Sequence, residues 1–274
     1  MRLKTVPGTA VVAMALTAAS NYPNEIAQWR QQREASLKAE GGWLSLTGLF
    51  WLHEGANPFG KDADSEIALE DGPAHAGVLE LRGGTVTVRM DGTTREVKPD
   101  SAEVVKAGRL NLFVIKRSDK YGIRVKDPES PARRGFHGIE SFAANESYRI
   151  TAKWVAEPRR IPILNVLGQT EDSESPGYAV FPLGGKEFRL HPILEEPAAK
   201  ELFYIFRDET AGKETYGAGR FLYSEMPKEG KVVLDFNKAY NPPCAFTPYA
   251  TCPLPPPENR LAARIEAGEK KYGH

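Results

Sequence analysis

The sequence lacks the features that mark nucleic-acid-binding or membrane-spanning proteins. Its 274 residues contain 36 Lys and Arg residues against 36 Asp and Glu residues. This balance leaves no net field to attract nucleic acid or an anionic membrane. Beyond the N-terminus, no segment has the length and apolar character of a membrane span, which needs about 20 consecutive apolar residues. We therefore expect neither a nucleic-acid partner nor a transmembrane segment.

Familiar catalytic and metal-binding motifs are also missing. The sequence contains no G-x-S-x-G elbow, no H-E-x-x-H and no P-loop, which disfavours an ordinary α/β-hydrolase, a zincin and an NTPase. Its five histidines are scattered and show no metal-ligand spacing with one another or with the two cysteines. We predict no metal and no cofactor.

The first 20 residues have the pattern of a signal peptide. Arg2 and Lys4 form a short basic region, and an apolar run, VVAMALTAA, extends from Val11 to Ala19. Small residues follow where a signal peptidase could cut. Residues 1–20 are predicted to be removed, which places the protein in the periplasm or outside the cell. The alternative is a cytoplasmic protein with a frayed N-terminal tail.

The rest of the chain reads as a series of short strands. Apolar and polar residues alternate in segments such as TVTVRM, and the two-residue turns Gly83-Gly84 and Asp91-Gly92 favour hairpins. No helical pattern of crossover length lies between the strands, which argues against a parallel βαβ fold. We predict one β-rich domain over residues 21–274, an antiparallel barrel or a two-sheet sandwich. Helices are expected at Asn24–Leu37 and Glu258–Lys271.

A proline-rich segment, Phe236–Leu261, is the densest stretch of the chain. It contains seven prolines, which fix the backbone in advance and favour an ordered extended strap across the β core. It also contains both cysteines, Cys244 and Cys252, with seven residues between them. In an exported protein such a pair favours a disulfide. Buried structural thiols come next, followed by a nucleophilic Cys244 or a metal site.

Candidate binding residues lie in this strap and just before it. Beyond acting as a brace, the strap could place Asn237, Tyr240 and Asn241 beside a pocket. Arg220 follows Gly219 at the start of an apolar strand, where its planar guanidinium could bind a carboxylate or phosphate. A structural salt bridge from Arg220 to Asp208 or Asp235 is an equally good interpretation.

Carboxylates are the remaining candidates for chemistry. Asp235 ends an apolar strand, where partial burial could shift its pKa. Glu258 and Asp127 are potential partners of Asp235 in a general acid–base pair. Glu258 could instead act only as a helix cap.

Four segments resemble a bacterial and archaeal family catalogued as a domain of unknown function. They are GWLSLTGLFWLHEGANPFG, IRVKDPESPARRGFHGIESF, DETAGKETYGAGRFLY and LDFNKAYNPPCAFTPYATCPLPPPENRLAARIEAGEKKY. The family has no established activity, so the resemblance implies only which segments are its hallmarks. These contain Arg124 and Asp127, Arg220, and the region from Asp235 to Asn259, with LDFNKAYNPPCAFTPYATCPLPPPENRL as the most specific part.

The function expected first is the binding of a small polar or anionic molecule in a pocket beside the strap, by Arg124, Asp127, Arg220, Asp235, Asn237, Tyr240 and Asn241. The second is a hydrolase that uses carboxylates or Cys244 in the same pocket. A flavin-binding split barrel ranks third. The fourth is a structural envelope protein in which the strap only seals a sheet edge.

Overall fold

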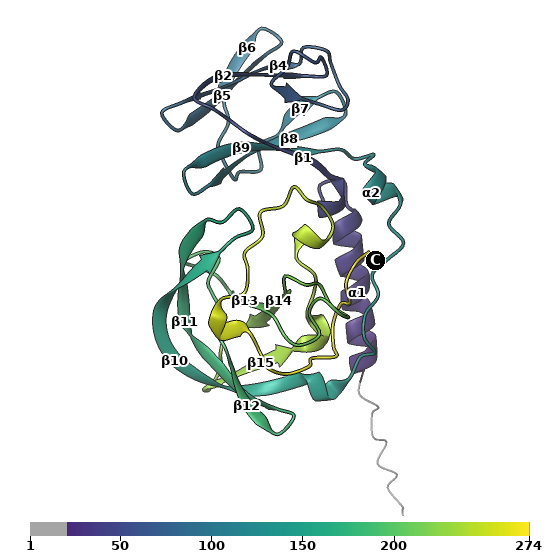
Figure 1. Cartoon of the computed structure of the whole chain (residues 1–274), viewed down its shortest axis with the longest axis vertical. Helices are drawn as coiled ribbons and strands as arrows, with labels where there is room; N and C mark the ends of the chain where they lie inside the picture. The colour runs from purple at the N-terminus through teal and green to yellow at the C-terminus, as the bar shows by residue number, and fades with distance from the viewer. Residues whose placement is uncertain (1–20, 274) are drawn as a thin grey trace, which may run out of the picture.

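The computed structural model describes residues 21–273, which form two groups of strands beside one long helix. In Figure 1 the N-terminal strand group (β1–β9) lies above the C-terminal strand group (β10–β15). The N-terminal group comprises β1 Leu46–Trp51, β2 Gly55–Gly60, β3 Ile67–Ala68, β4 Gly77–Arg82, β5 Thr85–Met90, β6 Thr93–Glu96, β7 Val105–Ala107, β8 Leu110–Arg117 and β9 Lys120–Lys126. The C-terminal group comprises β10 Arg149–Leu164, β11 Thr170–Leu183, β12 Lys186–Leu190, β13 Glu201–Phe206, β14 Arg220–Glu225 and β15 Lys231–Asp235.

Four sheets make up these two groups. Their strand orders are β1-β9-β8-β7 and β3-β2-β4-β5-β6 in the N-terminal group, and β12-β11-β10-β15 and β13-β14 in the C-terminal group. All strand pairs are antiparallel except the short β2–β3 pair. The mainly antiparallel prediction is therefore confirmed. The barrel is wrong, because each sheet within residues 21–273 begins and ends on a different strand and none closes on itself.

The hairpin signals in the sequence correspond to real turns. β4 pairs with β5 across Gly83-Gly84, and β5 pairs with β6 across Asp91-Gly92. The backbone of Asp91 and of the three glycines has positive φ, as such two-residue turns require. One strand is longer than expected: β10 runs for 16 residues through the basic pair Arg159-Arg160.

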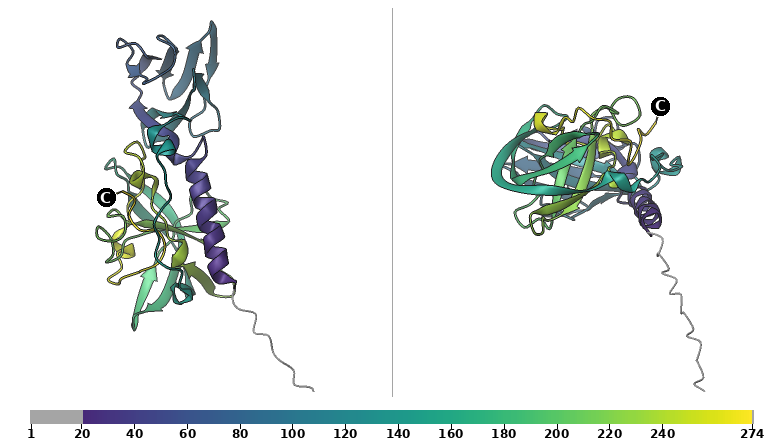
Figure 2. Two further views of the ribbon diagram at one scale, coloured as in Figure 1. Left: turned by 90° about the vertical axis from the view of Figure 1, so that its right-hand side faces the viewer. Right: turned by 90° about the horizontal axis from the view of Figure 1, so that it is seen from below.

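Helix α1 (Tyr22–Lys38) confirms the predicted N-terminal helix and begins two residues earlier. Its buried residues Tyr22, Ile26 and Leu37 face the body of the protein, and Figure 2 shows the helix running alongside the C-terminal group up to the N-terminal group. A second, four-residue helix, α2, covers Pro131–Arg134. None of the helices within residues 21–273 is long and apolar enough to cross a bilayer.

The predicted C-terminal helix is wrong. Only one turn of 3-10 helix, Pro257–Asn259, forms, and the chain beyond it is irregular. Its backbone N–H groups bond to distant segments instead of to each other, for example from Leu261 to the Arg207 carbonyl and from Glu269 to the Ala239 carbonyl. These tertiary hydrogen bonds outweigh the local helix preference of the sequence.

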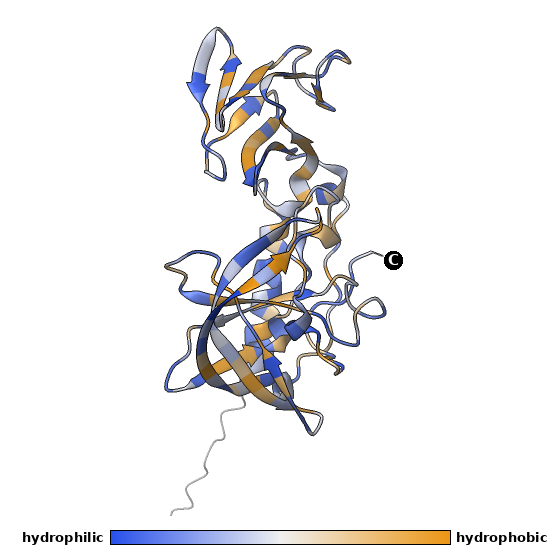
Figure 3. Ribbon diagram, turned by 60° about the vertical axis from the view of Figure 1, so that its left-hand side comes forward, coloured by the Kyte–Doolittle hydropathy of each residue, from blue (hydrophilic) through white to orange (hydrophobic). Residues whose placement is uncertain are grey.

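The buried apolar side chains form separate clusters. One fills the N-terminal group, around Leu79, Leu112 and Ile123. Two others lie in the C-terminal group, and the larger of them contains Phe181 and Phe236. Figure 3 shows hydrophilic and hydrophobic residues alternating along the strands of both groups, as half-buried sheets require. A single domain over residues 21–274 stays a prediction, and the predicted signal peptide lies outside the described residues.

The strap (Phe236–Leu261) connects the two strand groups. In Figure 1 the yellow C-terminal part of the chain rises from the C-terminal group towards β1 and β9. Thr247 donates a hydrogen bond to the Leu46 carbonyl at the start of β1 (3.1 Å). Two arginines of the N-terminal group, Arg117 and Arg124, bond to Thr251. The strap therefore holds residues of both groups around a common space.

Candidate functional site

Arg220 is buried at the start of β14, with 1% of its side chain exposed. Its guanidinium donates to Asp208 Oδ1 (3.1 Å), to the Ile265 carbonyl (3.0 Å) and to the Ala267 carbonyl. The structure thus places Arg220 in the structural pair with Asp208 that the sequence offered as the alternative. Arg220 lines neither of the two cavities described below, so its predicted contact with a ligand gains no support from its position.

Asp235 and Asn237 belong to a network that ties helix α1 to the end of β15. The Tyr22 hydroxyl donates to Asp235 Oδ1 (2.7 Å), and the Asn237 amide donates to the Tyr22 oxygen (2.7 Å) and to the Asn145 carbonyl (2.9 Å). Burial, together with the hydrogen bond to Asp235, raises the pKa of Tyr22 well above its usual value. Asn237 is fully buried, so its contacts hold the fold, whereas Asp235 also lines the larger cavity described below.

Asn241 is also enclosed by the fold. Its backbone N–H donates to Glu269 Oε2 (2.7 Å), and its amide donates to the Lys270 carbonyl (2.7 Å). Glu269 is in turn paired with Arg33 of α1 (3.1 Å), while burial raises the pKa of this carboxyl. These bonds anchor the strap between α1 and the chain end. Asn241 lines neither cavity.

The three candidate carboxylates lie in three separate networks. Asp127 accepts hydrogen bonds from Nε and Nη2 of Arg109, each at 2.9 Å, and these hydrogen bonds lower the pKa of the carboxyl. Glu258 pairs with Arg159 (3.4 Å), and Asp235 is held by Tyr22. No contact among the described residues joins Asp235 to either proposed partner, so the structure gives the acid–base pair no support.

A cavity of about 340 Å³ lies where the strap meets both strand groups. It takes residues from α1, from the 3-10 turn Trp43–Ser45, from β8 and β9, from β13 and β14, and from the strap. The lining side chains are Arg33, Trp43, Arg117, Arg124, Glu195, Phe203, Phe221, Tyr223, Tyr240, Pro243, Thr251, Cys252 and Pro253. We call this space the strap cavity. Two of the predicted binding residues, Arg124 and Tyr240, meet in its lining.

Three arginines and one carboxylate line the strap cavity. Arg33 and Arg117 have carboxylate partners outside its lining, Glu269 (3.1 Å) and Asp100 (2.9 Å). Glu195, the single carboxylate in the lining, accepts a hydrogen bond from the Tyr223 hydroxyl (2.6 Å).

Arg124 is the exceptional member of this group. Its guanidinium donates to Thr251 Oγ1 (3.0 Å) and lies over the Trp43 ring, with Cζ 5.1 Å from the ring centroid. It makes no ion pair with any carboxylate in residues 21–273, and its buried Nε has no hydrogen-bond partner there. Burial, with the nearby Arg117 charge, lowers the pKa of Arg124 to about 10. Partial burial of a cation without an ion-pair partner is unfavourable, and a bound anion would relieve that cost.

The alternation of strand β9 explains why Arg124 points to this side. Ile123 and Val125 are buried in the core of the N-terminal group. Successive side chains of a strand face opposite sides, so Arg124 projects away from that core. Arg117 at the end of the paired strand β8 also reaches Thr251, through its Nε (3.1 Å). Two guanidinium groups therefore converge on one hydroxyl oxygen.

Aromatic rings of the C-terminal group form another part of the lining. Phe203 stacks on Tyr223 with ring centroids 4.9 Å apart, and Phe221 packs edge-on against Phe203 at the same distance. The Arg33 guanidinium lies over the Tyr240 ring, 4.5 Å from its centroid. A lining that combines guanidinium groups with aromatic rings suits a ligand with an anionic group on an apolar or aromatic body.

A larger cavity, of about 780 Å³, adjoins the first. The two share Arg33, Tyr223 and Tyr240. The larger cavity is lined otherwise by residues of α1, β10, β14 and β15, including Asp235, with cationic and acidic side chains mixed. It therefore lacks the excess of arginines over carboxylates that is found in the lining of the strap cavity.

The two cysteines lie side by side in the strap. The backbone N–H of Cys244 donates to Cys252 Sγ (3.2 Å), and the Cys244 thiol donates to the Ala250 carbonyl (3.5 Å). Both are free thiols in this structure. Their proximity is what the predicted disulfide requires, and the disulfide itself stays a prediction.

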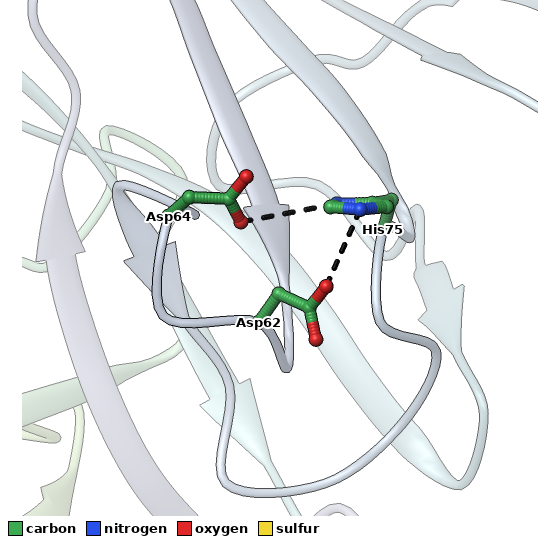
Figure 4. Close-up of side chains that lie close together, drawn as sticks. All are labelled: Asp62, Asp64 and His75. Atoms are coloured by element: carbon green, nitrogen blue, oxygen red, sulfur yellow. Dashed lines mark ion pairs between the residues drawn. The ribbon is translucent and has the colours of Figure 1, made fainter.

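Figure 4 shows three metal-ligating side chains close together in the N-terminal group, Asp62, Asp64 and His75. His75 Nε2 lies 3.3 Å from Asp62 Oδ2, and His75 Nδ1 lies 4.0 Å from Asp64 Oδ1. All three are exposed, and exposed acidic groups of this kind are stable in water without an ion. We assign no metal site to them.

The sequence did not indicate most of the cavity lining, including Arg33, Trp43 and Arg117. Arg33 follows Trp29 by four residues, a spacing that puts both on one face of helix α1, and both line the larger cavity. That spacing could have indicated Arg33. Trp43 and Arg117 lie far from the strap in sequence, and only the packing of the two strand groups brings them to it.

The architecture defines a β-rich protein with a cationic and aromatic cavity under a proline-rich strap. The chain belongs to the family described as "Protein of unknown function (DUF1684)", whose model matches residues 134–270. This confirms the resemblance seen in the sequence. The match covers the C-terminal strand group and the strap, whereas Arg117 and Arg124 precede it.

A solution NMR structure of an uncharacterised protein from Haloarcula marismortui is also similar. The two sequences are 30% identical, the similarity covers 53% of this chain and 82% of that chain, and the TM-score is 0.43. A search of curated proteins found no match.

Proposed function

We propose that this protein binds a small molecule that carries an anionic group on an aromatic or apolar body, and that the strap cavity is its binding site. The observation that carries the proposal is Arg124, a half-buried cation with no carboxylate partner among residues 21–273 and with a buried, unpaired Nε. A carboxylate, phosphate or sulfonate accepts hydrogen bonds from such a guanidinium in a planar, forked geometry.

The rest of the lining supports the same ligand class. Arg117, which is paired with Asp100, places a second guanidinium group beside Arg124, because both donate to Thr251. The stacked rings of Phe203 and Tyr223 offer an apolar surface for the body of the ligand. Binding at this site does not use Arg220, Asn237 or Asn241, whose hydrogen bonds are made within the fold.

The proposal includes export of the protein to the periplasm or beyond. Its support is the basic start and the apolar run Val11–Ala19. The hydrolase alternative has weaker support, because Asp127, Asp235 and Glu258 are held in three separate networks.

The test compares an anionic and a neutral fluorescent probe of similar shape, 8-anilinonaphthalene-1-sulfonate and N-phenyl-1-naphthylamine. We expect the wild-type protein to bind the sulfonate more tightly. A hydrogen-bonded charge contributes about 1.5–3 kcal/mol, so Arg124→Gln should weaken binding of the sulfonate about tenfold or more. Affinity for the neutral probe should change little.

The control is Arg82→Gln, which removes the same charge from an exposed residue of the N-terminal group that pairs with Glu80. It should bind both probes as the wild type does. Equal affinity of the wild type for the two probes, or unchanged sulfonate binding in a folded Arg124→Gln variant, would refute the proposal. A complete lack of binding would favour a structural role for the strap.

A further inference from the structure

The strap cavity has a pair of thiols at its edge. Cys252 is part of the lining, and Cys244 contacts it, with a backbone N–H to Sγ hydrogen bond of 3.2 Å. Cys252 is 5% exposed, whereas Cys244 is half-buried and more accessible. This arrangement suits thiol–disulfide exchange. The accessible thiol attacks a substrate disulfide, and the protected thiol then attacks the mixed disulfide and releases the substrate.

The surroundings of the pair favour a thiolate on Cys244. A hydrogen bond from the Cys252 thiol lowers the pKa of Cys244 to about 7, and the Arg124 charge acts in the same direction. The same hydrogen bond, together with burial, raises the pKa of Cys252. Cys244 is therefore the nucleophile of the pair, and Cys252 keeps its proton until the second step.

We propose that Cys244 and Cys252 form a redox-active dithiol that reduces a small anionic disulfide held at Arg124 in the strap cavity. This inference rests on the proposed anion site, because Arg124 would hold the charged group of the disulfide while the adjoining thiols reach its sulfur–sulfur bond. Tyr216 supports the geometry by donating a hydrogen bond to the Cys244 carbonyl (3.2 Å), which fixes the strap next to the nucleophile.

The reaction balances in two steps. The Cys244 thiolate attacks one sulfur of the bound disulfide, forming a mixed disulfide and releasing the first thiolate. Cys252 then loses its proton to solvent and attacks Cys244 Sγ, forming the Cys244–Cys252 disulfide and releasing the second thiolate. The protein loses two electrons, and the small disulfide gains them. The product is the disulfide that the sequence predicts.

The composition of the chain makes the test direct, because Cys244 and Cys252 are its two cysteines and every thiol signal comes from this pair. The reduced protein is mixed with 5,5′-dithiobis(2-nitrobenzoate), a dianionic aromatic disulfide, or with the neutral 4,4′-dithiodipyridine. We expect two thiolates released per protein and a final protein mass lower by two hydrogens. Release of one thiolate with a stable adduct on wild-type protein would overturn the dithiol.

Substitutions assign the two roles. Cys252→Ser keeps a hydroxyl donor beside Cys244, so it should release one thiolate quickly and retain the mixed disulfide on Cys244. Cys244→Ser should react more slowly by about tenfold or more, because its remaining thiol is buried and protonated. A mixed disulfide that forms on Cys252 of Cys244→Ser at the wild-type rate would overturn the assignment of Cys244 as the nucleophile.

The ratio of the two reagent rates isolates the anion site. Arg124→Gln alters the reactivity of Cys244 towards both reagents, but it removes attraction only for the anionic one. We expect the ratio of dianionic to neutral reagent rates to fall about tenfold in Arg124→Gln and to stay unchanged in Arg82→Gln. An unchanged ratio in Arg124→Gln would show that the thiols react without help from the cavity, and would overturn the coupling.

Failure of this inference is distinguishable from failure of the proposed function. Cys244→Ser, which changes a residue outside the cavity lining, should still bind the sulfonate probe with the preference over the neutral probe seen in wild type. Probe binding without disulfide formation would leave the anion site in place and overturn the redox chemistry. Disulfide formation without a preference for anionic probes would overturn the site itself.

Discussion

Replacing Arg220 with methionine should strongly destabilise the fold. The side chain is 1% exposed, and it donates hydrogen bonds to Asp208 and to the carbonyls of Ile265 and Ala267. Methionine fills a similar volume against Phe206, whose ring centroid lies 5.2 Å from the guanidinium carbon. It leaves a buried carboxylate without its cation and two carbonyls without their donor.

The expected fall in unfolding free energy comes from the broken ion pair. Removing one partner of a buried ion pair costs about 3–5 kcal/mol. For a chain of this size each kcal/mol lowers Tm by about 2–4 °C, so Tm should fall by about 6–20 °C. The partners that remain on Asp208 are the Ile265 N–H (2.8 Å) and the hydroxyl and backbone N–H of Thr210, and none of them carries a positive charge.

The assay is thermal unfolding followed by circular dichroism at neutral pH. Arg82→Met is the matched control, because its pair with Glu80 is exposed and should contribute less than about 1 kcal/mol. The double variant Arg220→Met/Asp208→Leu should be more stable than Arg220→Met alone, since the uncompensated charge is gone. A Tm within about 2 °C of wild type for Arg220→Met, combined with loss of probe binding, would refute the structural role and restore Arg220 as a ligand residue.

The contacts of Arg124, Cys244 and Asp127 each determine a measurable property. Below about pH 7, where Cys244 is protonated, Arg124→Met should raise the Tm of the ligand-free protein, by about 1 kcal/mol or more of unfolding free energy, because it removes a half-buried cation that makes no ion pair with a carboxylate within residues 21–273; a lower Tm would contradict this. The rate of Cys244 alkylation by iodoacetamide should rise with pH through a midpoint near 7, set by Cys252 and Arg124, with the Tyr216 hydroxyl as a further titratable neighbour, whereas a midpoint near 8.5 would indicate an ordinary thiol. The pair of Asp127 with Arg109 lowers the pKa of the carboxyl from 3.8, so its contribution to stability is present above about pH 4 and is lost as the pH falls through the lowered value. Asp127→Asn should therefore be less stable than wild type at pH 7, and chemical denaturation should show this difference shrinking below pH 4; a difference independent of pH would argue against it.

The sequence was informative wherever structure depends on neighbours along the chain. Alternating residues and two-residue turns predicted the hairpins at Gly83-Gly84 and Asp91-Gly92, and the apolar spacing of Asn24–Leu37 predicted helix α1. It failed at Glu258–Lys271, where the helical pattern is local but the backbone hydrogen bonds are made with distant segments.

The candidate site was predictable only in part, for the same physical reason. Arg124 and Tyr240 were proposed as binding residues and meet at the strap cavity, but Arg220 and Asn241 are enclosed by partners that no spacing reveals. A glycine-flanked arginine has the same sequence whether its guanidinium faces a pocket or a buried aspartate. Burial and counter-ions, which decide between these roles, come from packing.

The strap cavity takes residues from both strand groups, with Arg117 and Arg124 on β8 and β9 and the rings of Phe203, Phe221 and Tyr223 on β13 and β14. A ligand that touches both sets of residues therefore joins two parts of the protein that have separate apolar cores. At 100 times its dissociation constant such a ligand would stabilise the folded protein against unfolding by about 2.7 kcal/mol. Because its contacts come from both groups, unfolding of either group would release it, so binding should protect the two groups together.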